Sequence, residues 1–476
     1  MEALVEQSEA KQVKIIREML TFDDVLLVPK RSNVASRMDV DLSTKLTRNI
    51  ELNIPLVSAN MSTVTESAMA ICLAQQGGFG IIHRNMPIDK EVEEVKKVKR
   101  SENTVIDSPF TIYPGDTIER AISEMEKHGV SGLVVVNEDN KVTGILTNRD
   151  LTFETGGKMV SEVMTRDPIV SKVGAPIEEI IALMKREKVE KIPLVDENNV
   201  LKGLVTARDI LKKIKHPHAC RDAKGRLRVG ASIGIRGDYK ERTEALLNAE
   251  ADVIAVDVAH GHMERVLEIT AWLKKNYGCE IIAGNVATKE GTRDLIEAGA
   301  DAVKVGVGPG SICITRRIAG TGVPQLTAVM DCAQEASKFE VPVIADGGIK
   351  IPGDLVKAIA AGASTCMMGN LFAGTEESPG RIIFRNEKRY KLYHGMASWT
   401  ALQGLKDSER TPEGVESLVP YKGSAKEVIA NLLGGLRSGM SYSNAHTIKE
   451  LWKNAEFIKI TNAGLKESSS HNVEVI

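Results

Sequence analysis

Residues 253–306 read VIAVDVAHGHMERVLEITAWLKKNYGCEIIAGNVATKEGTRDLIEAGADAVKVG, and this stretch decides the fold. It contains three short apolar runs, at 253–257, 281–285 and 302–306, and the residues between them have helical apolar spacing. Strands that alternate with helices in this way predict a parallel sheet whose strands are joined by crossover helices.

The same pattern continues on both sides of this stretch. Five further apolar runs lie at 55–60, 79–83, 229–233, 342–346 and 365–369, which gives eight in all. Helices are predicted at 236–249, 263–275, 289–298, 328–337 and 352–361. Eight buried strands, each feeding a helix, predict an α/β protein with a (β/α)8 TIM barrel, and an open doubly wound sheet is the alternative.

The middle of the chain is a duplication. Equivalent residues are 59 positions apart: Pro109 and Pro168, Met125 and Met184, Gly144 and Gly203, Asp150 and Asp209. The two copies resemble a tandem pair of CBS domains. The resemblance implies three parts: 1–101 as the first part of the barrel, 102–214 as the CBS pair, and 215–476 as the second part with an active-site flap and a C-terminal segment.

The CBS resemblance also implies a regulatory site for an adenine or guanine nucleotide. The residues that match it are Thr147, Asp150, Thr206 and Asp209. A carboxylate suits two ribose hydroxyls and a Thr hydroxyl suits a phosphate. The alternative is that these residues only cap the helices that follow them.

Composition excludes several classes of protein. The chain has 476 residues, with 62 Lys and Arg against 64 Asp and Glu, so its net charge of −2 argues against binding nucleic acid or membrane by bulk charge. Aromatic residues are only 4%, and the six cysteines form no CxxC pair, which argues against base-stacking platforms, zinc clusters and a disulfide scaffold. No apolar run is long enough to span a membrane, and residues 1–20 are charged throughout. We therefore expect a short helical N-terminal extension and a cytoplasmic protein.

Polar residues gather where the predicted strands end. They are Asn60, His83, Ser232, Asp257, Asn285, Asp346 and Asn370. Active sites of TIM barrels lie at the C-terminal ends of the strands, so these side chains are expected to surround one site. Ordinary turn chemistry is the alternative, because Asn, Asp and Ser also favour loops.

The sharpest local signal is KVGVGPGSICITR at 304–316. Its glycines let the backbone approach a ligand, and Cys313 stands on a loop beside Arg316, where a thiolate nucleophile is favoured. The other cysteines, Cys72, Cys220, Cys279, Cys332 and Cys366, are expected to be inert. Glycine turns also follow Asp346 and precede Asn370, where barrels often bind phosphate. The residues alone thus predict an enzyme that binds a phosphorylated sugar beside a reactive cysteine.

Four segments together resemble the IMP dehydrogenase / GMP reductase family. They are LTFDDVLLVP at 20–29, the Cys313 loop, ADGGI at 345–349 and GGLRSG at 434–439. The resemblance implies that Cys313 adds to C2 of a purine mononucleotide and forms a thioimidate. A reductase makes this intermediate from GMP with loss of ammonia and reduces it to IMP with NADPH. A dehydrogenase makes it from IMP with NAD+ and hydrolyses it to XMP.

The resemblance also implies roles for individual residues. Ser311, Gly348, Gly369 and Asn370 match phosphate ligands, although Asn370 stands where the dehydrogenase usually has Ser. Asp346 matches the ribose ligand, Met396, Ala397 and Glu413 match positions around the purine, and Thr315 matches a Thr that assists proton transfer. Cys313, Thr315 and Glu413 are the expected catalytic residues. Asp257 and Asn285 are expected to hold the nicotinamide cofactor. The carbonyls of Gly308, Gly310 and Cys313, with Glu467 of a neighbouring subunit, match a site for a monovalent cation such as K+. The family implies a homotetramer that can stack into an octamer through the CBS pair.

Departures from the family pattern decide the expected reaction. A dehydrogenase has a long flap with an Arg-Tyr pair, but here only residues 399–411 join the Gly-Met-x-Ser and Pro-Glu-Gly motifs, without such a pair. Asn60 is reductase-like, and residues 257–261 lean weakly the same way. The best interpretation is therefore a GMP reductase-like enzyme.

Two residues oppose that interpretation. Trp399 stands where the reductase has a Glu partner for Thr315, so that Glu409 or Glu413 would have to substitute, and Ser62 replaces the Asp of both groups. An IMP dehydrogenase with a shortened flap and a non-catalytic nucleotide-binding regulator remain the alternatives.

Overall fold

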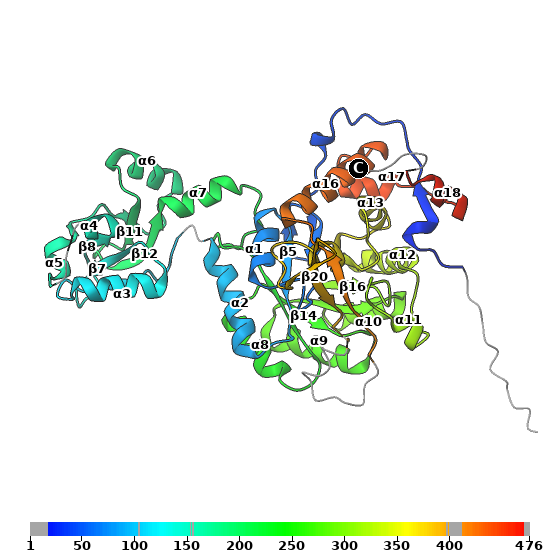
Figure 1. The fold of residues 1–476 in the computed structure, drawn as a ribbon, viewed down its shortest axis with the longest axis horizontal. Coiled ribbons are helices and arrows are strands. Elements are labelled where there is room, and N and C mark those ends of the chain that lie inside the picture. Colours follow the sequence, from blue (N-terminus) through cyan, green and yellow to red (C-terminus); the bar gives the residue numbers. More distant parts are fainter. Residues whose placement is uncertain are drawn as a thin grey trace, which may run out of the picture.

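The computed structural model describes residues 18–102, 105–152, 154, 157–396, 398 and 412–470. Figure 1 shows a large body built around a barrel and a smaller body to one side of it, which is formed by the duplicated segment. The predicted N-terminal helical extension falls almost entirely on residues 1–17, outside the described residues.

The centre of the large body is a closed barrel of parallel strands. Its strand order is β13-β14-β15-β16-β17-β18-β4-β5. The strands are β4 (Leu56–Ser58), β5 (Phe79–Ile82), β13 (Gly230–Ile233), β14 (Val253–Asp257), β15 (Glu280–Val286), β16 (Ala302–Val305), β17 (Val343–Asp346) and β18 (Thr365–Met368). All eight coincide with the predicted runs, so the TIM barrel is confirmed and the open sheet is excluded.

Helices surround the barrel. They are α1 (Ser67–Gln75), α2 (Ile88–Ser101), α8 (Tyr239–Asn248), α9 (Glu264–Tyr277), α10 (Lys289–Glu297), α12 (Gln325–Ala336), α13 (Pro352–Ala360) and α16 (Ala425–Tyr442). Helix α12 begins three residues before the predicted start. Its first residue, Gln325, is buried because its amide donates to the carbonyl oxygens of Val305 and Asp346.

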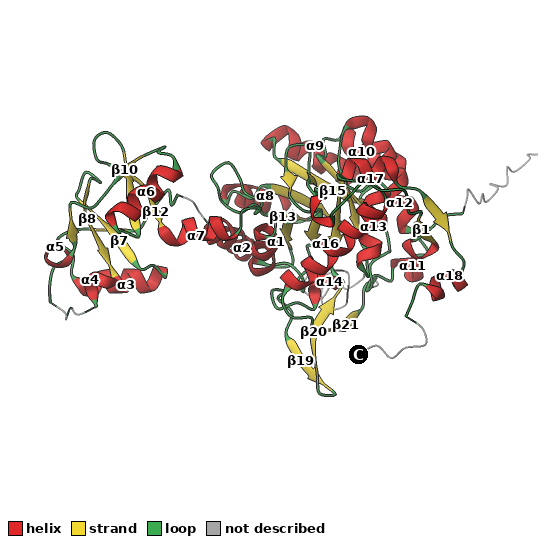
Figure 2. Cartoon of the chain, turned by 90° about the horizontal axis from the view of Figure 1, so that it is seen from above, coloured by secondary structure: helices red, strands yellow, loops and turns green. Residues whose placement is uncertain are grey.

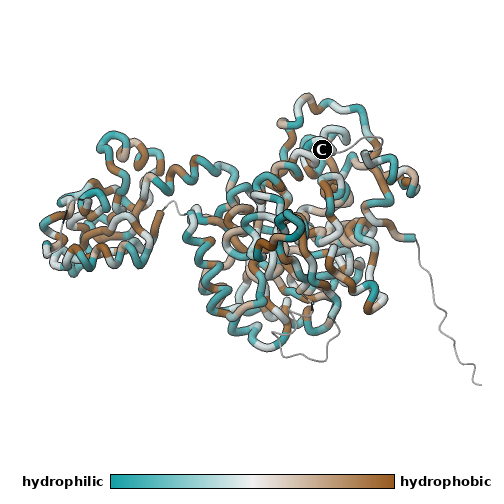
Figure 3. The backbone as a smooth tube through the Cα atoms, viewed as in Figure 1, coloured by the Kyte–Doolittle hydropathy of each residue, from teal (hydrophilic) through white to brown (hydrophobic). Residues whose placement is uncertain are grey.

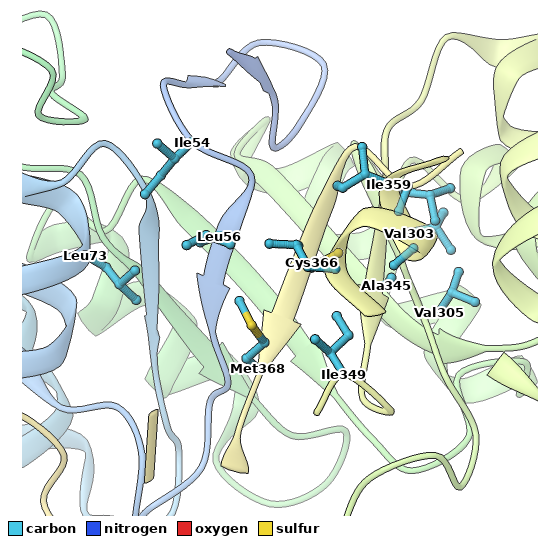
Figure 4. Close-up of a cluster of buried hydrophobic side chains, with 14 of the residues drawn as sticks. Ile54, Leu56, Leu73, Val303, Val305, Ala345, Ile349, Ile359, Cys366 and Met368 are labelled. Carbon is cyan, nitrogen blue, oxygen red and sulfur yellow. The ribbon is translucent and has the colours of Figure 1, made fainter. Parts of the chain in front are cut away.

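The two faces of each barrel strand bury different side chains. Leu56, Val303, Val305, Cys366 and Met368 pack with the surrounding helices, as Figure 4 shows for this part of the core. The alternate residues, such as Val57, Ile344 and Met367, fill the barrel interior. Burial on both faces explains why the strands read as continuous apolar runs. In Figure 3 the exposed outer helices are correspondingly mixed in hydropathy.

The duplicated segment forms two small sheets of the same design. The first copy contains β6 (Thr111–Ile112), α3 (Ile118–His128), β7 (Gly132–Val136), β8 (Val142–Thr147), α4 (Asn148–Leu151), α5 (Val160–Val163) and β9 (Thr165–Arg166). The second contains β10 (Ser171–Lys172), α6 (Ile177–Glu187), β11 (Lys191–Val195), β12 (Leu201–Thr206) and α7 (Ala207–Lys215). Helices α3 and α6, like strands β7 and β11, start 59 residues apart. A shared core that includes Val134, Val142, Val195 and Leu204 joins the copies.

The remaining elements flank the barrel. They are η1 (Phe22–Asp24), β1 (Val25–Leu27), η2 (Arg37–Asp39), β2 (Thr44–Lys45), β3 (Glu51–Leu52), α11 (Thr315–Ile318), η3 (Ser337–Phe339), α14 (Asn370–Ala373), β19 (Ile382–Arg385), β20 (Lys388–His394), β21 (Glu416–Pro420), α17 (Ile448–Asn454), β22 (Phe457–Lys459) and α18 (Asn462–Glu467). Strands β19, β20 and β21 form an antiparallel sheet that projects from the large body in Figure 2. Among the described residues, no helix is long and apolar enough to cross a membrane.

Charged side chains hold the chain at the N-terminal end of the barrel strands, where it leaves for the duplicated segment and where it returns. The Lys99 ammonium, at the end of α2, lies 2.6 Å from Asp252 and 3.1 Å from Asp222. Arg221, which follows α7, lies 2.5 Å from Glu102. Both connections to the duplicated segment are therefore fixed by ion pairs.

Candidate active site

The Cys313 loop connects β16 to α11 and packs tightly on the end of β17. Gly306 begins it with φ +152°, and a Cβ atom there would collide with the carbonyl oxygen of Asp346. Gly308 has φ +86°, and the Arg316 side chain lies where its Cβ would be. Only glycine fits at both positions, so the sequence motif sets the path of the loop.

A line of three side chains runs from the sulfur of this loop. The Cys313 thiol donates to Thr315 Oγ1 at 3.2 Å, and the Thr315 hydroxyl donates to Glu413 Oε2 at 2.6 Å. The segment that carries Glu413 is fixed against the loop, because the Ile314 amide donates to the Glu413 carbonyl at 2.8 Å. Through the Thr315 hydroxyl, this arrangement can carry a proton between the Glu413 carboxylate and a group bound next to the Cys313 sulfur.

The other cysteines lie in different surroundings. Cys72, Cys220, Cys332 and Cys366 are buried, and Cys279 is half-buried. Burial raises the pKa of the Cys72, Cys220 and Cys332 thiols to about 12 and that of Cys279 to about 11, and it raises the pKa of Cys366 further. These thiols stay protonated at neutral pH and are poor nucleophiles.

Asp346 ends β17 beside the Cys313 loop. Its Oδ2 atom accepts from the Lys304 ammonium at 2.9 Å and from Asn285 Nδ2 at 2.9 Å. The Asp346 side chain is 21% exposed, so the carboxylate can still accept from a ligand. The position suits the ribose role that the sequence predicts.

The predicted phosphate residues meet at one corner of the barrel mouth. The Gly347–Gly348 turn packs on Pro309, next to Ser311 of the loop. Gly369 lies against the hydroxyl of Tyr393, which also interacts with the Ser311 side chain. Asn370 begins α14, immediately after Gly369.

Tyr393 is a site residue that sequence reasoning missed. It lies on β20 and is only 3% exposed, and burial raises the pKa of its phenol to about 12. The phenol is therefore a stable hydrogen-bond donor at this corner. Its place two residues before the Gly395-Met396 pair is the only sequence signal for it.

The other side of the mouth carries buried polar atoms that make no hydrogen bond to the protein, although His83 Nε2 lies 3.5 Å from a carboxylate oxygen of Glu66. They are Asn60 Nδ2, Ser62 Oγ, His83 Nε2 and Arg84 Nε among the described residues. Asp257 lies beside them, with its carboxylate 3.4 Å from Arg84. Unpaired buried donors are costly unless a polar ligand meets them, and a nicotinamide carboxamide offers both donor and acceptor groups. The residues present therefore fit a nicotinamide cofactor. Asn285, by contrast, uses its amide within the protein.

Four other predictions concern the rest of the site. Met396 follows β20 and is half-buried, and Ala397 and the predicted flap, 399–411, lie outside the described residues.

The carbonyls of Gly308, Gly310 and Cys313, which are predicted to bind a monovalent cation, are all on the Cys313 loop, and carbonyl oxygen is the ligand that K+ prefers. Glu467 ends the exposed helix α18, which packs near η1. The cation site stays a prediction. The described residues contain no cluster of His, Cys, Asp and Glu able to hold a metal ion.

The residues of the duplicated segment that are predicted to bind a nucleotide form equivalent caps. Thr147 Oγ1 donates to Asp150 Oδ2 at 2.7 Å, and Thr206 Oγ1 donates to Asp209 Oδ2 at 2.5 Å. The capping interactions that the sequence allows are thus present in both copies. Nucleotide binding there stays a prediction.

Comparison with known proteins identifies the family. The model of the IMP dehydrogenase / GMP reductase domain matches residues 19–471. The chain belongs to the IMP dehydrogenase / GMP reductase family. It is therefore an oxidoreductase of that family, as the four sequence segments indicated.

The similar proteins include both IMP dehydrogenases and a GMP reductase. The chain is 49% identical to an inosine-5'-monophosphate dehydrogenase of Nitrosopumilus maritimus, over 96% of this chain and 99% of that protein. It is 52% identical to the enzyme of the same name from Aquifex aeolicus, over 97% of each. Among solved structures, a GMP reductase of Trypanosoma brucei in complex with guanosine 5'-monophosphate has a TM-score of 0.91 and 43% identity, covering 96% of this chain and 99% of that one. The same reductase with guanosine 5'-triphosphate has a TM-score of 0.81 and 39% identity, covering 94% and 99%.

Proposed function

We propose that the protein is a GMP reductase that converts GMP, NADPH and two protons to IMP, NADP+ and ammonium. The observation that carries this proposal is the contact between Thr315 and Glu413, whose oxygens are 2.6 Å apart. A reductase needs a carboxylate on this threonine to protonate departing ammonia, and Trp399 occupies the usual place of that carboxylate. Glu413 supplies the missing group from the other side of the loop.

The proposed chemistry begins at Cys313. Its thiolate forms a bond to C2 of GMP, and the exocyclic amine leaves as ammonia with a proton from the Thr315–Glu413 pair. The product is a thioimidate between the sulfur and the purine. A reduced nicotinamide, when bound, supplies a hydride to C2. The bond to Cys313 then breaks, which releases IMP and restores the thiolate.

The rest of the mouth binds and orients the substrate in this proposal. Asp346 accepts from the ribose hydroxyls, while Ser311, Gly348, Gly369 and Asn370, together with Tyr393, hold the phosphate. Asn60, Ser62 and His83 offer polar atoms to the cofactor beside Asp257. The complex of the Trypanosoma brucei reductase with guanosine 5'-monophosphate supports a guanine nucleotide as substrate.

The dehydrogenase reaction is the second candidate. Relatives of that name are about half identical to this chain over nearly its whole length. Against it, residues 399–411 contain no Arg-Tyr pair to activate water. Without such a group hydrolysis loses about 100- to 10,000-fold in rate.

One assay in both directions separates the candidates. Purified full-length protein with GMP and NADPH is expected to lose absorbance at 340 nm and to release ammonia. Rapid NADH formation from IMP and NAD+, with no ammonia from GMP, would establish the dehydrogenase instead. Nucleotide binding without turnover in either direction would establish the non-catalytic regulator.

We also propose that residues 102–214 act as a regulatory CBS pair within a homotetramer. Thr147 with Asp150, and Thr206 with Asp209, would bind a purine nucleotide. The complex of the Trypanosoma brucei reductase with guanosine 5'-triphosphate makes GTP the first effector to test. A thermal shift with GTP that is lost in Asp150→Ala plus Asp209→Ala supports the proposal, and a shift that persists contradicts it.

A further inference from the structure

A lysine is buried inside the barrel beneath the nucleotide site. On β16 the alternate residues Val303 and Val305 pack outward against the helices, so that Lys304 faces the barrel interior. Its side chain is only 4% exposed. Lysine is almost never buried this deeply unless its charge is paired.

The ammonium of Lys304 joins the ends of the two strands that flank β16. It donates to Asp346 Oδ2 at 2.9 Å on β17 and to Asn285 Oδ1 on β15. Asn285 closes the triangle, because its Nδ2 donates to the same Asp346 oxygen at 2.9 Å and to the Gly306 carbonyl at 2.8 Å. Both polar atoms of Asn285 are thus occupied within the protein.

This triangle leaves one carboxylate oxygen of Asp346 for a ligand. Oδ2 accepts two hydrogen bonds from below, whereas Oδ1 accepts none among the described residues. Two fixed donors on one oxygen prevent the carboxylate from rotating. The free oxygen is therefore held in one position, on a side chain that is 21% exposed.

We propose that Lys304 and Asn285 are positioning residues that aim Asp346 at the ribose and make the site select ribonucleotides over 2'-deoxyribonucleotides. The inference rests on the proposed function, which places a ribose at Asp346. The free oxygen has two lone pairs, so that, held in place, it can accept from two adjacent hydroxyls. A deoxynucleotide would leave one acceptor position desolvated and unpaired, which a preorganised site penalises more than a mobile one.

The backbone beneath Asp346 is fixed separately. Gln325 donates to the Val305 and Asp346 carbonyls at 2.9 and 3.2 Å. The close contact of Gly306 with the Asp346 carbonyl holds the same strand end. A change at Lys304 is therefore expected to free the carboxylate without moving the strand.

The test is the ratio of the dissociation constants for 2'-deoxy-GMP and GMP, measured by calorimetry on the full chain. Wild type is expected to bind GMP at least about 30-fold more tightly than 2'-deoxy-GMP. Lys304→Met keeps the stem but removes the charge, and its ratio is expected to fall to about threefold or less. Lys304→Arg should restore part of the ratio, and Asn285→Ala should lower it.

Lys274→Met is the matched control. Lys274 pairs with both oxygens of the buried Asp301, at 2.7 and 2.9 Å, away from the barrel mouth. The Lys274→Met variant should keep the wild-type ratio of the two dissociation constants. A merely structural role for Lys304 would lower stability in both lysine variants but leave the ratio unchanged.

Each outcome has a defined meaning. A folded Lys304→Met protein that keeps the wild-type ratio would overturn the inference, as would a wild type with no preference for ribose. Should Lys304→Met fail to fold, the ratio in Asn285→Ala decides in the same way. Wild type that binds neither nucleotide would refute the proposed function, which is a different failure.

Discussion

At the C-terminal end of the barrel strands several buried polar atoms of the described residues have no hydrogen-bond partner, whereas at the N-terminal end the buried charge of Lys99 is paired twice. Asn60 Nδ2 and Ser62 Oγ have no such partner at the first end. At the second end Lys99 lies between Asp222 and Asp252. Unpaired groups keep binding capacity for a ligand, and paired groups contribute to stability and fix the duplicated segment. Substitutions at the two ends should therefore change different quantities.

The largest expected effect comes from a substitution that abolishes the reaction but leaves substrate binding intact. Cys313→Ala should lower kcat by about 10,000-fold or more, because no other group can form the thioimidate. Calorimetry should show GMP binding within about threefold of wild type. Cys279→Ala is the matched control and should keep full activity. A Cys313→Ala enzyme that still turns over would refute the covalent mechanism.

Glu413→Gln tests the proton relay at the same end. It should lower kcat for GMP reduction by about 100- to 10,000-fold, because the amide cannot deliver a proton through Thr315. Thr315→Val should lose a similar factor, and the double variant should lose little more, since the two residues act as one unit. Steady-state assays on the four proteins measure this. Additive losses would show that Glu413 acts independently of Thr315.

Lys99→Met tests the opposite end. Removing the ammonium leaves Asp222 and Asp252 without their shared partner, so the free energy of unfolding should fall by about 3–5 kcal/mol. Denaturant titration measures this loss, and kcat at a temperature where the variant is folded should match wild type. A variant with normal stability but impaired kcat would contradict the division between the two ends.

The smallest expected effect is a pH dependence at the same end. Hydrogen bonds from Arg226 and Lys224 lower the pKa of Glu250 from its ordinary 4.5 to about 2. The folded state therefore holds the ionised form more strongly than the unfolded state. The stabilisation of the folded state by ionised Glu250 is complete above about pH 4.5 and is lost as the pH falls toward 2.

Because Glu250 is 47% exposed, the contribution should stay below about 1 kcal/mol. The difference in Tm between wild type and Glu250→Gln should be largest near pH 6 and should vanish toward pH 2. The exposed Glu244 on α8, the helix that ends two residues before Glu250, supplies the control variant, Glu244→Gln. A difference that grows on acidification would contradict the assigned sign.

The barrel could be predicted because its strands are buried on both faces and so read as unbroken apolar runs. The loop of Cys313 was equally visible, since its glycines and its cysteine are local in sequence. The carboxylate partner of Thr315 could be narrowed only to Glu409 or Glu413, because Glu413 is 98 residues away and reaches the loop only through the return of the chain before β21.

Two further site residues carried weak signals. Tyr393 lies in a short hairpin where an aromatic residue is unremarkable in sequence. Lys304 stands between Val303 and Val305, so that its burial follows only from the alternation of a strand whose place in the barrel is already known. Both roles depend on contacts with residues elsewhere in the sequence, which no local sequence pattern indicates.

The central claim is that ammonia leaves C2 of GMP with a proton from Thr315 and Glu413 after Cys313 attacks. A single-turnover rapid-quench experiment with GMP and NADPH tests it most directly, by counting ammonia and IMP formed at each active site. The account predicts one ammonia and one IMP per site in wild type, with ammonia release about 100-fold slower or worse in Glu413→Gln. No ammonia from GMP, together with steady XMP formation from IMP and NAD+, would contradict it.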